Sequence, residues 1–155
     1  MIKCEKMKKT ISCLNNLCQM KENLLLKYLA PILLFTLRIM IALVFLKSGL
    51  VKISNMDSTI LLFEYEYQVP FLSPVLAAYS ATFFELACSI ALIAGFATRL
   101  ACLPLIAMTL VIQFTILQHE MHLYWLAILT TILTFGAGII SLDYPLKKAI
   151  RKCCK

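Results

Sequence analysis

The sequence predicts an all-α membrane protein, built as a bundle of four transmembrane helices. Composition is the first reason, because 61% of the 155 residues are hydrophobic, only 15% are charged and the mean hydropathy is +0.87. A soluble domain carries about 25% charged residues. Pattern is the second reason, because four apolar stretches approach the roughly 20 residues that cross a bilayer. The short polar segments between them leave no room for a separate catalytic domain.

Residues 1–28 form a basic N-terminal tail, in which Lys outnumbers the two acidic residues Glu5 and Glu22. A weak apolar stripe with helical spacing runs through it at Cys4, Met7, Ile11, Leu14 and Cys18. This pattern leaves two interpretations open. One is a basic amphipathic helix on an anionic leaflet, and the other is a disordered tail.

The four predicted spans occupy residues 29–53, 75–96, 100–117 and 123–142. The first apolar stretch is too long for a signal-peptide core and no small-residue cleavage motif follows it, so we expect it to be retained. Pro31 suits the first turn of this helix, where its missing N–H costs little.

The first long loop, residues 54–73, contains a predicted short helix over Thr59–Tyr67. Asn55, Asp57 and Ser58 precede it and are good N-cap residues. Aromatic residues alternate with Glu64 and Glu66 in this segment, and aromatic side chains favour the membrane interface. We therefore expect a short interfacial helix in the first external loop.

Charge predicts the orientation of the bundle. Four spans place both termini on one side, together with the basic tail of residues 144–155 and with Arg99. Basic residues beside spans favour the cytoplasm, so both termini are expected there. The net charge of +7 is explained by this flanking pattern, and we expect no nucleic-acid partner.

Three charged residues lie within the predicted spans: Arg38, Lys47 and Glu85. Each is costly in a bilayer and needs a partner or a purpose. Nine residues turn a helix by about 180°, so Arg38 and Lys47 cannot face the same partner. We expect Arg38 to pair with Glu85 inside the bundle. Lys47, and Lys52 near the boundary, are expected to reach the surface along their flexible stems.

The predicted Arg38–Glu85 pair has two interpretations. It is either a polar site, which anchors a ligand or handles protons, or a structural ion pair that holds two helices in register.

A metal site is not expected. The cluster His119, Glu120 and His122 lacks the i, i+4 histidine spacing of a zinc-hydrolase helix. Neither histidine lies within a span, so no heme ligand set is present. None of the seven cysteines lies in a predicted external loop, so no disulfide framework is expected.

Several motifs together resemble the DoxX family of small bacterial membrane proteins, over about residues 36–144. They are Arg38 with Phe45-Leu-Lys-Ser-Gly-Leu-Val-Lys52, Phe63-Glu-Tyr-Glu-Tyr-Gln-Val-Pro70, Glu85, Gly95…Thr98-Arg99, and Gly136-Ala-Gly138…Ser141-Leu-Asp143. The motif positions that carry over are Arg38, Gly49, Lys52, Glu85, Arg99 and Asp143. The resemblance implies a four-helix domain over 29–143, in the bacterial cytoplasmic (inner) membrane and multi-pass. No cofactor ligand set comes with it.

The resemblance also links the chain to membrane redox chemistry, since the family is named after a subunit of a terminal quinol oxidase, also described as a thiosulfate:quinone oxidoreductase. The first hypothesis is an accessory subunit of a quinone-linked oxidoreductase complex, not a self-contained enzyme, with quinone as its ligand. Two alternatives stay open: a small transporter or lipid-phase ligand binder, and a structural module that docks a partner. The partners considered are membrane lipid, a redox partner protein and a second copy of the chain.

Overall fold

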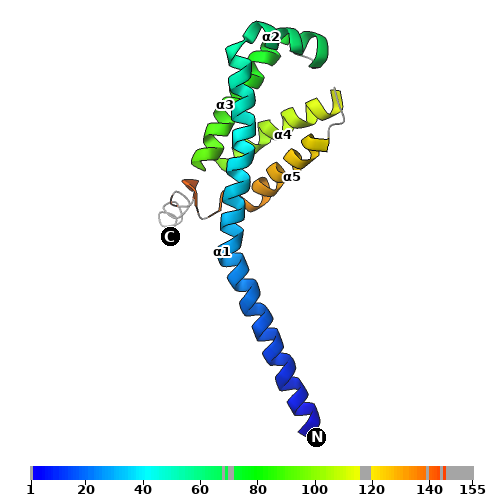
Figure 1. Ribbon diagram of the computed structural model, residues 1–155, viewed down its shortest axis with the longest axis vertical. Helices are drawn as coiled ribbons and strands as arrows, with labels where there is room; N and C mark the ends of the chain where they lie inside the picture. Colours follow the sequence, from blue (N-terminus) through cyan, green and yellow to red (C-terminus); the bar gives the residue numbers. More distant parts are fainter. Residues whose placement is uncertain are drawn as a thin grey trace, which may run out of the picture. The chain divides into compact units, whose positions relative to one another are not determined.

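The computed structural model describes residues 2–67, 69, 72–115, 120–138, 140–143 and 145, and all regular structure in them is helical (Figure 1). The predicted all-α class is confirmed. The chain divides into two compact units, Met1–Leu33 and Leu34–Lys155. In chain order the elements are α1 (Ile2–Ser54), α2 (Met56–Leu62), the π-helical turn η1 (Phe63–Tyr67), α3 (Pro74–Ala94), α4 (Thr98–Thr115) and α5 (Glu120–Phe135).

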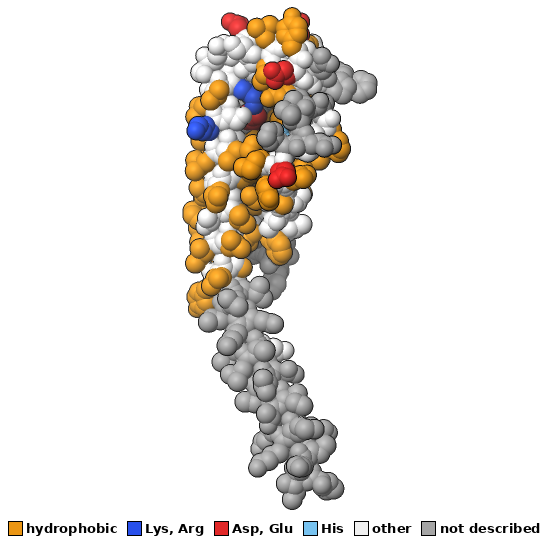
Figure 2. All heavy atoms as spheres, turned by 45° about the vertical axis from the view of Figure 1, so that its right-hand side comes forward, with side chains coloured by type: hydrophobic (Ala, Val, Ile, Leu, Met, Phe, Trp, Pro, Cys, Tyr) orange, Lys and Arg blue, Asp and Glu red, His pale blue; other side chains and the backbone are white. Residues whose placement is uncertain are grey.

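Two of the described helices are long and apolar enough to cross a membrane: α1 over Lys27–Ser54, and α3. The apolar helices over Thr98–Phe114 and Glu120–Phe135 are shorter. Large apolar side chains are widely exposed, including Phe114 at 84% and Phe135 at 73%. Figure 2 shows apolar side chains over much of the described surface, with charged side chains gathered toward the end where α2 lies. Such continuous apolar surface is typical of contact with lipid.

The first helix begins far earlier than the predicted first span, because the backbone is helical from Ile2. Pro31 therefore lies inside α1, and its expected place in a first turn is wrong. A proline in this position removes one backbone hydrogen bond. It lies close to the boundary between the two compact units, at Leu33 and Leu34. The apolar stripe expected in residues 1–28 concerns side chains outside the described ones.

The last helix ends at Phe135, so the prediction of helix up to Leu142 is wrong. Gly136 and Gly138 have φ angles of +80° and +75°, in the left-handed region that favours glycine and ends helices. Arg38 fixes the segment that follows. Its Nη1 and Nη2 donate to the carbonyl oxygens of Ala137 and Ile140, both at 2.8 Å.

The turn between α3 and α4 joins the same segment. The carboxylate of Asp143 accepts from the backbone N–H groups of Ala97 and Thr98, at 2.8 and 3.1 Å, and from the Thr98 hydroxyl at 3.0 Å. The Asp143 N–H donates to the Gly95 carbonyl at 3.0 Å. An acidic cap at a helix N-terminus satisfies free donors and complements the helix dipole. We call Arg38, Gly95, Asp143 and the carbonyls that Arg38 binds the arginine clasp.

The core of the second unit is formed where α1, α3, α4 and α5 meet, and its fully buried side chains include Ile41, Leu92, Leu105, Leu129 and Ile132. A smaller cluster joins the first loop to α3, because Phe63 of η1 packs with Ala77 and Ala78. The small cluster thus holds α2 and η1 against α3.

The arginine clasp predicts that Gly95→Ala lowers stability. Gly95 has a φ of +69°, and an added Cβ would lie 2.8 Å from Arg38 Nη1. The left-handed conformation alone costs a non-glycine residue about 1–2 kcal/mol. We expect a lower unfolding temperature in detergent for Gly95→Ala. Phe96→Ala is the control in the same turn, because Phe96 is exposed. Equal unfolding temperatures for Gly95→Ala and the wild type would contradict this account.

Candidate functional site

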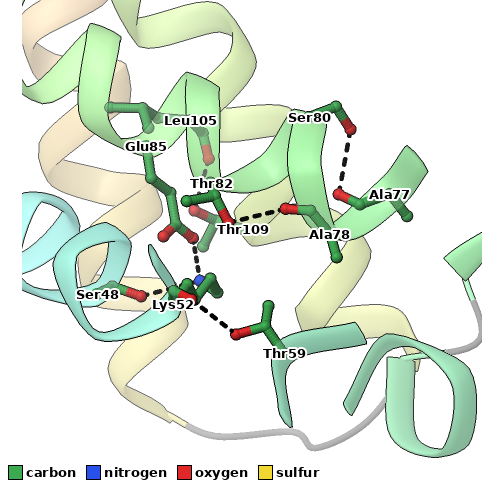
Figure 3. Close-up of polar contacts among 10 residues, drawn as sticks. All are labelled: Ser48, Lys52, Thr59, Ala77, Ala78, Ser80, Thr82, Glu85, Leu105 and Thr109. Carbon is green, nitrogen blue, oxygen red and sulfur yellow. Dashed lines mark hydrogen bonds and ion pairs between the residues drawn. The ribbon is translucent and has the colours of Figure 1, made fainter. Parts of the chain in front are cut away.

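A buried ion pair connects α1 to α3. Lys52 Nζ lies 2.5 Å from Glu85 Oε1, and the two side chains are only 12% and 4% exposed. Lys52 Nζ also donates to Ser48 Oγ at 3.0 Å, one helical turn earlier on α1 (Figure 3). The lysine therefore has two oxygen partners among side chains that are largely shielded from solvent.

Glycine at position 49 allows this pairing. An added Cβ there would lie 2.9 Å from Leu86 Cδ2 and 3.3 Å from Glu85 Cβ. A small residue at a helix contact lets two backbones approach closely, which is a common device in membrane helices. Gly49 therefore brings the α1 backbone close to Glu85, and Lys52 lies on the same face of α1 less than one turn further on.

The short helix α2 covers the end of α1 beside the pair. Asn55 caps it, since Asn55 Oδ1 accepts from the Ser58 N–H at 3.2 Å. Thr59 Oγ1 lies 3.2 Å from the Lys52 carbonyl oxygen (Figure 3). It also lies 3.0 Å from the Asn55 carbonyl oxygen. The last carbonyls of a helix lack partners within it, so Thr59 satisfies an otherwise free acceptor. The predicted helix over Thr59–Tyr67 is found as α2 and η1, beginning earlier, at Met56.

Two cavities border the Lys52–Glu85 pair. The apolar cavity has a volume of about 170 Å³, and its walls include Phe63, Tyr67, Phe84 and Met108. The polar cavity has a volume of about 250 Å³, and its walls include Ser48, Glu66, Tyr67, His122 and Trp125. Lys52 and Glu85 line both.

Glu85 presents a free oxygen at this junction. Its Oε1 is engaged by Lys52, but its buried Oε2 has no hydrogen-bond partner among the described residues. A buried acceptor without a partner costs about 1–3 kcal/mol, and more when the group is charged. The site is therefore equipped to accept a hydrogen bond from a ligand or from water.

Tyr67 lies at the wall shared by the two cavities. Its pKa is raised, chiefly by burial and further by the carboxylates of Glu66 and Glu85. The phenol therefore stays protonated at neutral pH and keeps a hydrogen to donate.

The predicted pairing of Arg38 with Glu85 is wrong, although both side chains are buried, at 2% and 3% exposed. Arg38 lies beside Gly95, which is ten residues or about 15 Å along α3 from Glu85. Lys52 was expected to reach the surface, and this is also wrong because it pairs with Glu85. Lys47 is exposed, as expected.

A signal for the correct partner is present in the sequence. Fourteen residues separate Arg38 from Lys52, and at about 100° per residue they lie within about 40° of one another around α1. Both therefore face inward, at opposite ends of this part of the helix. Helical phase thus makes Lys52 a second candidate partner for Glu85. Depth in the predicted spans still favours Arg38, which lies nine residues from the start of its span while Glu85 lies eleven from the end of its own, on the same side.

The remaining predicted residues lie elsewhere. Arg99 is exposed and donates to the Thr134 carbonyl oxygen at 3.0 Å, and Asp143 belongs to the arginine clasp. Among the described residues no three His, Cys, Asp or Glu side chains gather as metal ligands, and His119 lies outside those residues. Trp125 and Tyr67 were not singled out by the sequence as site residues, and His122 was named only in the cluster for which no metal site is expected. In the structure Tyr67 of η1 lines the same cavity as His122 and Trp125 of α5.

Comparison with known protein families gives a match over the middle of the chain. The sequence model of the DoxX family matches residues 33–118, which is more than half of the chain. No curated protein and no solved structure matches it. The matched residues include Gly49, Lys52 and Glu85, whereas His122 and Trp125 of the polar cavity lie beyond them.

The ion pair predicts strong coupling between Lys52 and Glu85. Removing one partner of a buried pair costs about 3–5 kcal/mol, whereas replacing both by apolar residues is often neutral. Lys52→Met and Glu85→Leu should therefore each lower the unfolding temperature in detergent, and the double variant should recover most of the loss. Glu64→Leu is the control, because Glu64 is exposed. Losses that simply add in the double variant would count against the pair.

Proposed function

The chain belongs to the DoxX family of small integral membrane proteins, and on that premise we propose that it is a four-helix transmembrane protein that binds a quinone or quinol head group. It acts as an accessory subunit of a quinone-linked membrane oxidoreductase complex. Its surroundings are membrane lipid. The redox centre that exchanges electrons with the ligand belongs to a partner protein.

The helix lengths support four crossings. Helices α4 and α5 have 18 and 16 residues, about 27 and 24 Å at 1.5 Å per residue, against a hydrocarbon core of roughly 30 Å. The backbone is irregular after Phe135, and we propose that this segment completes the fourth crossing. Irregular backbone at membrane depth is tolerated where protein groups satisfy it, and Arg38 does this for Ala137 and Ile140.

One observation carries the ligand proposal: the free Glu85 Oε2, buried beside an apolar cavity. A quinol hydroxyl would donate to this oxygen. A quinone carbonyl would accept from Lys52, whose ammonium has three donors. The pair therefore matches both redox states of one ligand class.

The walls of the apolar cavity suit the rest of such a ligand. Phe63, Tyr67 and Phe84 offer aromatic surfaces for a flat ring. Leu72, Phe84 and Val111 line the cavity and are also partly exposed on the surface of the second unit. A ligand dissolved in lipid would thus reach the pair from the side and leave its tail outside.

A purely structural ion pair is the competing interpretation, and ligand binding separates the two. Trp125 is the single tryptophan of the chain and lines the polar cavity beside Lys52 and Glu85. Quinones quench indole fluorescence at short range. With excitation selective for indole rather than for the six tyrosines, the fluorescence of the protein therefore reports on this site.

We expect saturable quenching of Trp125 by a short-tailed quinone in detergent or nanodiscs. Losing one charge-assisted hydrogen bond costs about 1.5–3 kcal/mol, so Lys52→Met should weaken quinone binding about tenfold or more. Glu85→Gln should weaken the binding of the quinol, measured by competition. The matched controls are Lys47→Met and Glu64→Gln, at exposed positions outside both cavity walls. Quenching that does not saturate, or that is the same in Lys52→Met and Lys47→Met, would defeat the proposal.

The membrane orientation is tested separately. We expect green fluorescent protein fused after Lys155 to fluoresce, because both basic ends of the chain are proposed to be cytoplasmic. Alkaline phosphatase fused after Tyr67 should be active, because that loop is proposed to face the periplasm. The reverse pattern of the two reporters would overturn the orientation.

A further inference from the structure

The polar cavity brings together polar and titratable side chains from four elements. Residues Ser48 and Lys52 come from α1, Glu66 and Tyr67 from η1, Glu85 from α3 and His122 from α5, whereas α4 contributes only Ile112. A water molecule occupies about 30 Å³ of liquid and needs two to four polar partners. A cavity of about 250 Å³ with these walls has room and partners for several water molecules.

The cavity connects a buried group to an exposed one. At its inner end Glu85 is buried, with Oε2 unpartnered among the described residues. Glu66 lines the same cavity and is exposed, in the loop that is proposed to face the periplasm. His122 is half-buried, and its ring packs edge-on against Trp125 with centroids 5.0 Å apart. Histidine is the side chain whose charge ordinarily changes near neutral pH.

We propose that the polar cavity is a hydrated proton path, in which His122 relays protons between Glu85 and the solution beside Glu66. The proton path extends the proposed function and rests on it, because its protons come from the bound quinol. Oxidation of a quinol releases two electrons and two protons. The electrons pass to the redox centre of the partner protein, and each proton must leave the site.

The chemistry follows from the two cavities. As a quinol is oxidised in the apolar cavity, one of its O–H bonds breaks and an O–H bond forms at Glu85 Oε2. The proton then crosses water in the polar cavity to a neutral His122 nitrogen, and His122 returns it to solution. The second proton follows the same path after Glu85 is again deprotonated. The apolar cavity cannot serve as an exit, because beyond Lys52, Glu85 and Tyr67 its walls are apolar apart from Ser80.

The test is a pH titration of Trp125 fluorescence in nanodiscs without quinone, so that its outcome is independent of ligand binding. A protonated imidazole quenches an adjacent indole more strongly than a neutral one. We expect a fluorescence step in the neutral range in the wild type and no step in His122→Gln. In Glu85→Gln the midpoint should fall by about half a pH unit, a fraction of the 1–3 units produced by a charge in direct contact.

Two further measurements complete the test. Glu64→Gln should leave the midpoint unchanged, because Glu64 is exposed and outside the cavity walls. Acrylamide in the aqueous phase should quench Trp125, as a hydrated cavity requires. The proposal is overturned by a step that survives in His122→Gln, by an unchanged midpoint in Glu85→Gln, or by a Trp125 shielded from acrylamide. If saturable quinone quenching persists in that case, the proposed function stands and only the proton path fails.

Discussion

A carboxylate inside an apolar helix bundle needs a cation within reach, and in this chain Lys52 meets that need for Glu85 at 2.5 Å. Leaving either charge unpaired in such surroundings would cost several kcal/mol. The rest of the site follows from this contact. Gly49 permits the close approach of α1 and α3, and Thr59 holds α2 over the same turn of α1. The cavities are the spaces that remain on either side of the pair.

The chain uses its two buried cations in different ways. The guanidinium of Arg38 donates hydrogen bonds to backbone carbonyls of the segment after α5 and so ties that segment to α1. Around it, Gly95 and Asp143 leave little space. Lys52 instead pairs with a carboxylate that keeps one oxygen free beside two cavities. The arginine clasp thus holds backbone carbonyls, whereas the Lys52–Glu85 pair keeps an unpartnered carboxylate oxygen beside two cavities.

The helices were predictable from the sequence because hydropathy and charge are local properties, and the apolar stretches coincide closely with α3 and α4. The end of α5 was harder to predict, because Gly136 and Gly138 are compatible with a transmembrane span. The structure shows instead that the helix ends before them and that Arg38 supplies a hydrogen-bond partner for the backbone there. Helical phase places both Arg38 and Lys52 on the inner face of α1, and depth in the predicted spans favours Arg38, so the pairing of Glu85 with Lys52 becomes visible only in the structure. The polar cavity was not predictable, because its walls join Tyr67 of η1 to His122 and Trp125 of α5, two elements that are distant in the chain.

The central claim is that Glu85 is held by Lys52 and not by Arg38, and solid-state NMR in lipid tests it directly. Dipolar recoupling between ¹⁵N at the lysine Nζ and ¹³C at the Glu85 carboxyl, assigned with Lys52→Met and Glu85→Gln samples, measures the contact itself. We expect strong dephasing for the Lys52–Glu85 pair and none between arginine nitrogen and Glu85. Dephasing of Glu85 by Arg38 nitrogen, or no dephasing by Lys52, would contradict the arrangement of the site.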